Sequence, residues 1–254
     1  MKKLLILLFV FSFSCEQTAE EYINSAQIKL DSKDFIGADE ELDKAIDVYP
    51  KNSDLWLMSA VVNEKQYKLS DAKGCYTIAI ELGTKRKIAF YNGANLYLKD
   101  PKSGEAAFAI QFLDRLIEIY STDADAYFLR GSAYGIYGDY FNSLNPETSL
   151  AAYNYKKSII DYEKVIELTL EKTLKDGKFV LLKPDDMGLI ADAYYNKAAT
   201  TVNYAGETSF NDSIYYSYCK DLKNAEKWGH TSAIKLAKQF KCRKTMKKLL
   251  LLLL

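Results

Sequence analysis

The chain has 254 residues, in which 34 lysines and arginines balance 34 aspartates and glutamates. This length allows one or two domains with a sizeable core, and 48% apolar against 27% charged residues indicates a folded chain. The zero net charge argues against a nucleic-acid partner, because phosphate binding needs a basic face. The single histidine, His230, excludes histidine-rich metal cages and argues against histidine catalysis.

The chain opens with the three parts of a secretory signal. Lys2 and Lys3 are basic, residues 4–11 form an apolar run too short to span a bilayer, and small serines precede Cys15. A cysteine in this place resembles the signal of bacterial lipoproteins, which is cut before the cysteine that carries the lipid. The resemblance implies a signal peptide at 1–14, a lipidated tether at 15–18 and an anchor on Cys15. A plain cleaved signal or a retained apolar N-terminus is the alternative.

The body of the chain predicts amphipathic helices that repeat. Apolar residues recur at three- and four-residue spacing. Ala38 and Ala72 are 34 residues apart, and so are Ala45 and Ala79. Another unit is indicated by bulky and small residues that lead to a Gly-Asp-Tyr turn: Tyr127, Gly131, Tyr134, Gly138, Asp139 and Tyr140.

These positions resemble the tetratricopeptide repeat (TPR) family, in which small residues mark where helices approach most closely. The resemblance implies an all-α fold, a TPR-type helical-hairpin solenoid of about five units with a C-terminal capping helix. The predicted segments are a solenoid at 19–245 with units at about 19–52, 53–86, 87–123, 124–172 and 191–229, a cap at 230–242 and an apolar tail at 246–254.

Two inserts interrupt the repeat. The stretch 141–157 delays the second helix of the fourth unit, and it reads as a loop followed by an early extension of that helix. The stretch 173–190 precedes the fifth unit and is the one place where a short hairpin is expected. The tail Leu249–Leu254 is too short to cross a bilayer. It either extends the capping helix or is a gene-boundary artefact.

The cysteines are expected to have three roles. Cys15 is the predicted lipidation site. Cys219 and Cys242 lie on either side of the helix-ending Gly229, at similar heights in an antiparallel hairpin, so a disulfide is predicted. Two separate buried thiols are the alternative. Cys75 is expected to be a small packing residue.

No catalytic constellation is present in the sequence. His230 follows Gly229 and is expected to lie at a helix end, and no nucleophile elbow, Cys-His pair or phosphate loop occurs. The carboxylates at 39–41 are expected on a solvated helix face, and those at 185–186 at a helix N-terminus. The chain is therefore predicted not to be an enzyme and to need no metal and no cofactor.

The TPR resemblance also implies a peptide-binding groove. In that family, positions 5 and 9 of each first helix face the concave side. The residues at these positions are Leu57, Val61, Tyr91, Asn95, Phe128, Ser132, Tyr195 and Ala199. An aromatic and apolar groove suits a peptide segment of another protein, because rigid rings bury much area at low entropy cost. The alternative is that these rings pack against the capping helix or the inserts.

The function expected from these patterns is a lipid-anchored, non-enzymatic scaffold or adaptor of the bacterial cell envelope, with the outer membrane favoured. Its partner is another protein; neither nucleic acid nor a small-molecule substrate is expected. Two alternatives stay open. One is a subunit of an outer-membrane assembly complex, and the other is a carbohydrate-binding nutrient-uptake lipoprotein.

Overall fold

The computed structural model describes residues 17–100, 104–145, 149–171, 174–175, 178–179, 183–205, 212–239 and 242. The predicted signal peptide, Cys15 and the apolar tail lie outside these residues. The chain divides into two compact units, one ending at Thr84 and one beginning at Lys85, and each is described by itself.

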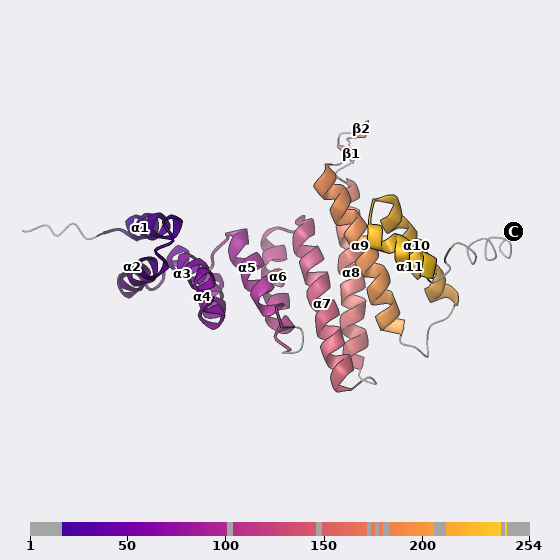
Figure 1. The fold of residues 1–254 in the computed structure, drawn as a ribbon, viewed down its shortest axis with the longest axis horizontal. Helices are drawn as coiled ribbons and strands as arrows, with labels where there is room; N and C mark the ends of the chain where they lie inside the picture. Colours follow the sequence, from indigo (N-terminus) through magenta and orange to yellow (C-terminus); the bar gives the residue numbers. More distant parts are fainter. Residues whose placement is uncertain are drawn as a thin grey trace, which may run out of the picture. The chain divides into compact units, whose positions relative to one another are not determined.

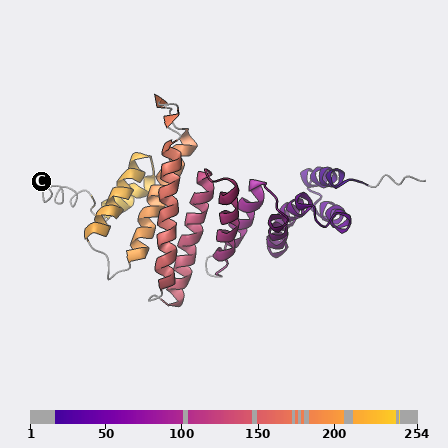
Figure 2. The same ribbon diagram turned by 180° about the vertical axis from the view of Figure 1, so that it is seen from behind.

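Nearly all of the described residues are helical (Figure 1). The first unit contains α1 (Ala19–Asp31), α2 (Phe35–Val48), α3 (Ser53–Lys65) and α4 (Leu69–Glu81). The second contains α5 (Lys87–Tyr97), α6 (Ala106–Ile119), α7 (Ala124–Leu144), α8 (Ser149–Glu171), β1 (Leu174–Lys175), β2 (Lys178–Phe179), α9 (Pro184–Ala205), α10 (Asp212–Lys227) and α11 (Thr231–Gln239). Consecutive helices pair as hairpins, and the reverse view shows the same order (Figure 2).

Side-chain caps determine where several helices begin. Thr18 and Glu21 form a reciprocal capping box at the start of α1. The Asn52 side chain accepts hydrogen bonds from two backbone N–H groups of the first turn of α3. The turns that follow α1 and α3 are tight, because Lys33 and Tyr67 adopt left-handed backbone angles there, with φ of 63° and 60°. Each first helix can therefore reverse directly into its second.

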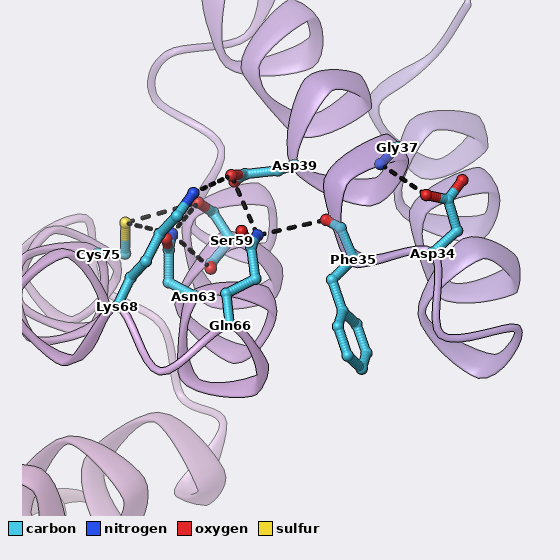
Figure 3. Close-up of polar contacts among 9 residues, drawn as sticks. All are labelled: Asp34, Phe35, Gly37, Asp39, Ser59, Asn63, Gln66, Lys68 and Cys75. Atoms are coloured by element: carbon cyan, nitrogen blue, oxygen red, sulfur yellow. Dashed lines mark hydrogen bonds and ion pairs between the residues drawn. The ribbon is translucent and has the colours of Figure 1, made fainter.

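The first unit buries small residues where its helices meet. One buried cluster of this unit consists of Ala26, Ala38, Leu42, Ala45, Leu55 and Val62. A polar joint ties its two hairpins together (Figure 3). Asp39 Oδ2 accepts from Gln66 Nε2 at 3.1 Å and from Lys68 Nζ at 2.8 Å, while Gln66 also donates to the Phe35 carbonyl. The expectation that 39–41 is merely a solvated face is therefore wrong, because Asp39 joins the hairpins and Glu41 pairs with Lys29.

In the second unit, α7 and α8 approach closely through glycines. A Cβ at Gly138 would lie 2.6 Å from the ring of Tyr155, and one at Gly131 would lie 3.2 Å from the ring of Tyr162. The residues of the first insert lengthen both helices, since α7 continues to Leu144 and α8 already begins at Ser149. In both views, this end of the α7–α8 hairpin extends beyond α6 (Figures 1 and 2).

The second insert contains the short hairpin that the sequence allows. β1 and β2 pair antiparallel, with Leu174 opposite Phe179. The fifth unit starts earlier than expected, because α9 begins at Pro184 rather than near 191. This extension has apolar contacts of its own, since Leu189 packs against a buried cluster that includes Val165 and Leu168 of α8, and Ile190 is buried. Asp185 and Asp186 lie in the first turn of α9, at the helix N-terminus that the sequence predicts.

The last hairpin is closed by the pair of cysteines. Cys219 of α10 and Cys242 are joined by a disulfide, with their Cα atoms 5.3 Å apart. Both side chains belong to a buried cluster with Ala198, Tyr218, Leu222, Ala225, Ala233 and Ala237. Gly229 has φ of +101°, which suits the tight turn between α10 and α11. Among the described helices, none combines the length and apolarity that crossing a membrane requires.

Candidate peptide-binding face

Six of the eight predicted groove residues lie on α5, α7 and α9, the first helices of the second unit. They are Tyr91, Asn95, Phe128, Ser132, Tyr195 and Ala199, and together they are called the first-helix face below. The other two, Leu57 and Val61, lie on α3 in the first unit. Leu57 is only 3% exposed, so its assignment to a binding surface is wrong. The reason is that α1, α2 and α4 all pack against α3, which leaves little of its surface open.

Asp123 holds α5 against the start of α7. Its carboxylate accepts from Lys87 Nζ at 2.5 Å and from Tyr91 Oη at 2.7 Å, and it also caps α7 by accepting from the Ala126 N–H. Burial would raise the pKa of Asp123, but the hydrogen bonds from Lys87 and Tyr91 outweigh burial and lower the pKa below its usual 3.8. The carboxylate is therefore charged at neutral pH, and it fixes the Tyr91 ring.

The middle of the first-helix face is held by Tyr162 of α8. Its ring packs edge-on against Phe128, with centroids 5.6 Å apart, and its hydroxyl shares a hydrogen bond of 3.1 Å with Ser132 Oγ. Tyr162 is itself buried, and burial raises its pKa to about 12. Phe128 and Ser132 are half-buried, so one side of each is fixed while the other is open to solvent.

The α9 end of the face includes the single histidine. The Tyr195 ring stacks on His230, with centroids 4.0 Å apart and planes 15° from parallel. His230 Nδ1 accepts from the Ala233 N–H at the start of α11, and Nε2 lies 3.5 Å from Asp192 Oδ1. His230 therefore lies at a helix end, as the sequence predicts, and it also orients Tyr195. The Tyr195 ring thus packs against the residue that begins the predicted cap, which is the alternative that the sequence left open for the groove rings.

In two of the three first helices, α7 and α9, a basic side chain bridges two second helices. Arg130 of α7 binds Asp161 of α8 through two nitrogens and Asp114 of α6 through a third, at 2.6–2.8 Å. Lys197 of α9 lies 2.9 Å from Glu163 of α8 and 3.5 Å from Asp221 of α10.

Both bases stay charged despite burial. Burial alone would lower the pKa of Arg130 and of Lys197, but the facing carboxylates outweigh it and raise both. Arg130 of α7 therefore links α6 to α8, and Lys197 of α9 links α8 to α10.

The side chains of this surface offer fixed rings and exposed groups that a ligand could contact. Three rings are held by internal contacts, while Asn95 and Ala199 are exposed one helical turn beyond Tyr91 and Tyr195 and offer an amide and a small apolar side chain. Rings that are already fixed lose little entropy when a ligand covers them. Within the described ranges, no group of three or more histidine, cysteine or acidic side chains could hold a metal ion.

Sequence reasoning missed Asp123 and the bridging bases. The bases do share a place in the sequence, since Arg130 and Lys197 both stand at the seventh position of the units predicted to begin at 124 and 191. Asp123 directly precedes α7 and reads from the sequence as a cap only. Its contacts with Lys87 and Tyr91 join residues more than 30 positions apart, which local spacing does not reveal.

No protein-family model and no curated protein matches this sequence. Among solved structures, the chain is similar to YrrB, described as a TPR protein with an unusual peptide-binding site, with a TM-score of 0.59 and 19% identity over 87% of this chain and 92% of that one. It is also similar to MamA, with a TM-score of 0.51 and 21% identity over 82% and 92% of the two chains.

A double mutant of MamA from strain RS-1 gives a TM-score of 0.52 and 14% identity over 84% of this chain and 96% of that one. At such identities the likeness is one of fold. It confirms the predicted all-α, TPR-type helical-hairpin solenoid.

Proposed function

We propose that this chain is a lipid-anchored scaffold of a bacterial cell envelope that binds a segment of another protein along the first-helix face of its second unit. The supporting fold is a protein-interaction fold, and YrrB, which shares it, is described as having a peptide-binding site. The anchor rests on the sequence around Cys15. No catalytic step is part of this proposal.

The observation that carries the binding proposal is that the face is ordered before any ligand arrives. Asp123 holds Tyr91, Tyr162 holds Phe128 and Ser132, and His230 holds Tyr195. None of these contacts closes the face, because Asn95 and Ala199 remain exposed. A surface that needs no reordering favours an extended or helical segment that lies across the rings.

Site-specific photo-crosslinking in native membranes tests the binding site. A photoreactive residue is placed at Asn95 or Ala199, which are exposed, so the replacement should leave the core undisturbed. A matched control carries it at Glu118, an exposed residue of the second helix α6. We expect the same protein adduct from both face positions and not from Glu118. An adduct shared by all three positions, or none from the face, would contradict the proposed site.

A variant that blocks the face at Ala199 tests whether the adducts at Asn95 and Ala199 come from one bound ligand. Replacing Ala199 with arginine puts a long charged side chain on the first-helix face, one helical turn from Tyr195, so we expect the adduct at Asn95 to fall at least fivefold. Replacing Glu118 with arginine is the control, and it should leave the Asn95 adduct unchanged. If the Ala199→Arg chain keeps its full adduct at Asn95, the partner does not span α5 to α9.

A further inference from the structure

The helix α11 begins at a histidine that caps it. His230 directly precedes Thr231, the first residue of α11, and its Nδ1 accepts a hydrogen bond of 3.2 Å from the Ala233 N–H. Serine, threonine, aspartate and asparagine are the side chains that usually accept this bond at the start of a helix. A histidine in this place differs from them, because its acceptor nitrogen can take up a proton near neutral pH.

The same imidazole also contacts α9. Its ring stacks on Tyr195 with centroids 4.0 Å apart, and its Nε2 lies 3.5 Å from Asp192 Oδ1. Because Nδ1 accepts from Ala233, the proton of the neutral ring is on Nε2, the nitrogen that faces Asp192. One side chain therefore joins the start of α11 to a ring of the first-helix face.

Protonation of Nδ1 would remove the cap. The new N–H would face the Ala233 N–H, and two donors cannot form a hydrogen bond with each other. It would also place a positive charge at the start of a helix, where the helix dipole disfavours cations. Asp192 attracts the charged ring at the same time, so the imidazolium is disfavoured at the cap and favoured on the α9 side. A ring that rotates away from the cap also changes its stack on Tyr195.

The rest of this end is held in place, so the change stays local. Ala233 is fully buried, and the disulfide between Cys219 and Cys242 ties the segment after α11 to α10. Loss of the cap is therefore expected to affect the first turn of α11 and the Tyr195 ring, and not the whole hairpin.

The charges on the helices that meet His230 have both signs. The nearest along α9, α10 and α11 are Asp192, Glu226, Lys227 and Lys235. Side chains of these types ordinarily keep their charge between pH 5 and 8, whereas histidine changes its charge there. A second source of pH dependence on α10 is Asp221, which faces Lys197 and whose pKa is raised by burial.

We propose that His230 is a pH-sensitive cap that holds Tyr195 and the start of α11 at neutral pH and releases both when the imidazole is protonated. The conformational change belongs to the chain alone. Its effect on binding rests on the function proposed above, because Tyr195 is one of the three rings of the first-helix face. A partner should then bind the α9 end of that face less tightly at pH 5.5 than at pH 7.5.

Nuclear magnetic resonance of the full chain tests the cap without any partner, and the single histidine makes its ring signals unambiguous. At pH 7.5, we expect ring-nitrogen shifts of a neutral imidazole protonated on Nε2, together with slow hydrogen exchange of the Ala233 amide. At pH 5.5, we expect this exchange to be at least fivefold faster after correction for its intrinsic pH dependence, and the Tyr195 ring signals to shift.

His230→Asn is the matched control, because asparagine caps helices well and does not titrate. It keeps Asp192 and Asp221, so the protection of the Ala233 amide should be equal at the two pH values. Equal protection at both pH values in the parent chain would overturn the proposal. A loss of protection at pH 5.5 that persists in His230→Asn would also overturn it, since another acid such as Asp221 would then be responsible.

Photo-crosslinking from Ala199 at the two pH values measures the effect on binding. We expect the parent's adduct to fall at least twofold at pH 5.5 and that of His230→Asn to stay constant relative to its own yield at pH 7.5. An equal fall in both chains would overturn the link between the cap and the face. No adduct at either pH, together with a titrating cap in the resonance experiment, would reject the proposed function and support the cap.

Discussion

At the scale of single residues, the aspartate before α7 illustrates how one side chain serves two elements. Asp123 caps α7 and also accepts hydrogen bonds from Lys87 and Tyr91 of α5. A carboxylate that accepts several hydrogen bonds, one of them from a cation, stabilises the folded chain more than an isolated cap does. The Tyr91 ring of the first-helix face depends on this contact.

We expect Asp123→Ala to lower the free energy of unfolding of the second unit by about 3 kcal/mol at pH 7, because it removes a cap and a charge-assisted hydrogen bond. Urea unfolding followed by circular dichroism measures the change. The control, Glu118→Ala on an exposed face, should stay within about 0.5 kcal/mol of the parent. A loss no larger than the control's would mean that Asp123 is not the joint between α5 and α7.

The difference in free energy of unfolding between the parent chain and Asp123→Ala should depend on pH. The pKa of Asp123 in the folded state lies below its usual value of 3.8. The ionised carboxylate therefore makes its full contribution to stability at pH values above 3.8. This contribution is lost as the pH falls through the folded-state pKa, because below it the Asp123 carboxyl is protonated in both the folded and the unfolded state. The difference between parent and Asp123→Ala should therefore be constant from pH 7 to 5 and shrink below about pH 4. A difference that persists unchanged at pH 3 would contradict this assignment.

At the scale of helices, the α7–α8 hairpin depends on glycine at its points of closest approach. Gly138 faces the Tyr155 ring, whereas the nearest atom to a Cβ at Gly135 of the same helix would be Ser158 Oγ at 3.6 Å, an ordinary contact. The two positions have the same helical propensity cost but different surroundings.

Gly138→Ala should therefore destabilise the chain by about 1–2 kcal/mol, since overpacking exceeds the gain in helix propensity. Gly135→Ala should instead stabilise it by about 0.5–1 kcal/mol. Denaturant unfolding of the two variants, made in parallel, measures both signs. If both variants change the free energy of unfolding in the same direction, helix propensity rather than packing against α8 determines the effect of these substitutions.

The disulfide belongs to the same scale, because it ties α10 to the segment after α11. Replacing both Cys219 and Cys242 with alanine should lower the free energy of unfolding by about 2–4 kcal/mol, since the closed loop restricts the unfolded chain. Intact-mass measurement should show a gain of two hydrogens when the parent or a Cys75→Ala control is reduced. An unchanged mass after reduction would mean that the thiols are free.

At the scale of the whole molecule, the proposed anchor and the two compact units matter most. The first unit and the second each have their own buried cluster. The proposed lipid would be attached shortly before α1, which begins at Ala19. The first unit would then lie nearest the anchor along the chain, and the second unit carries the first-helix face.

Replacing Cys15 with alanine should release the chain from membranes into the soluble fraction, because the proposed acyl chains would supply most of the membrane affinity. Fractionation of cells, with Cys75→Ala as the control that keeps its anchor, measures the change. Continued full membrane association of the Cys15→Ala chain would show that lipid is not what holds it.

The sequence by itself determined the helical repeat, the helix-ending glycine and which residues stand at positions 5 and 9 of each first helix. These features are local: period, caps and small residues repeat within 34 positions. The tertiary structure alone decided that Leu57 is buried, that Asp39 joins two hairpins and that Asp123 orders Tyr91, because each depends on a neighbour brought close by packing. It also decided that the first insert lengthens α7 and α8 into a projecting end, since helix length there follows from interhelical packing and not from the repeat.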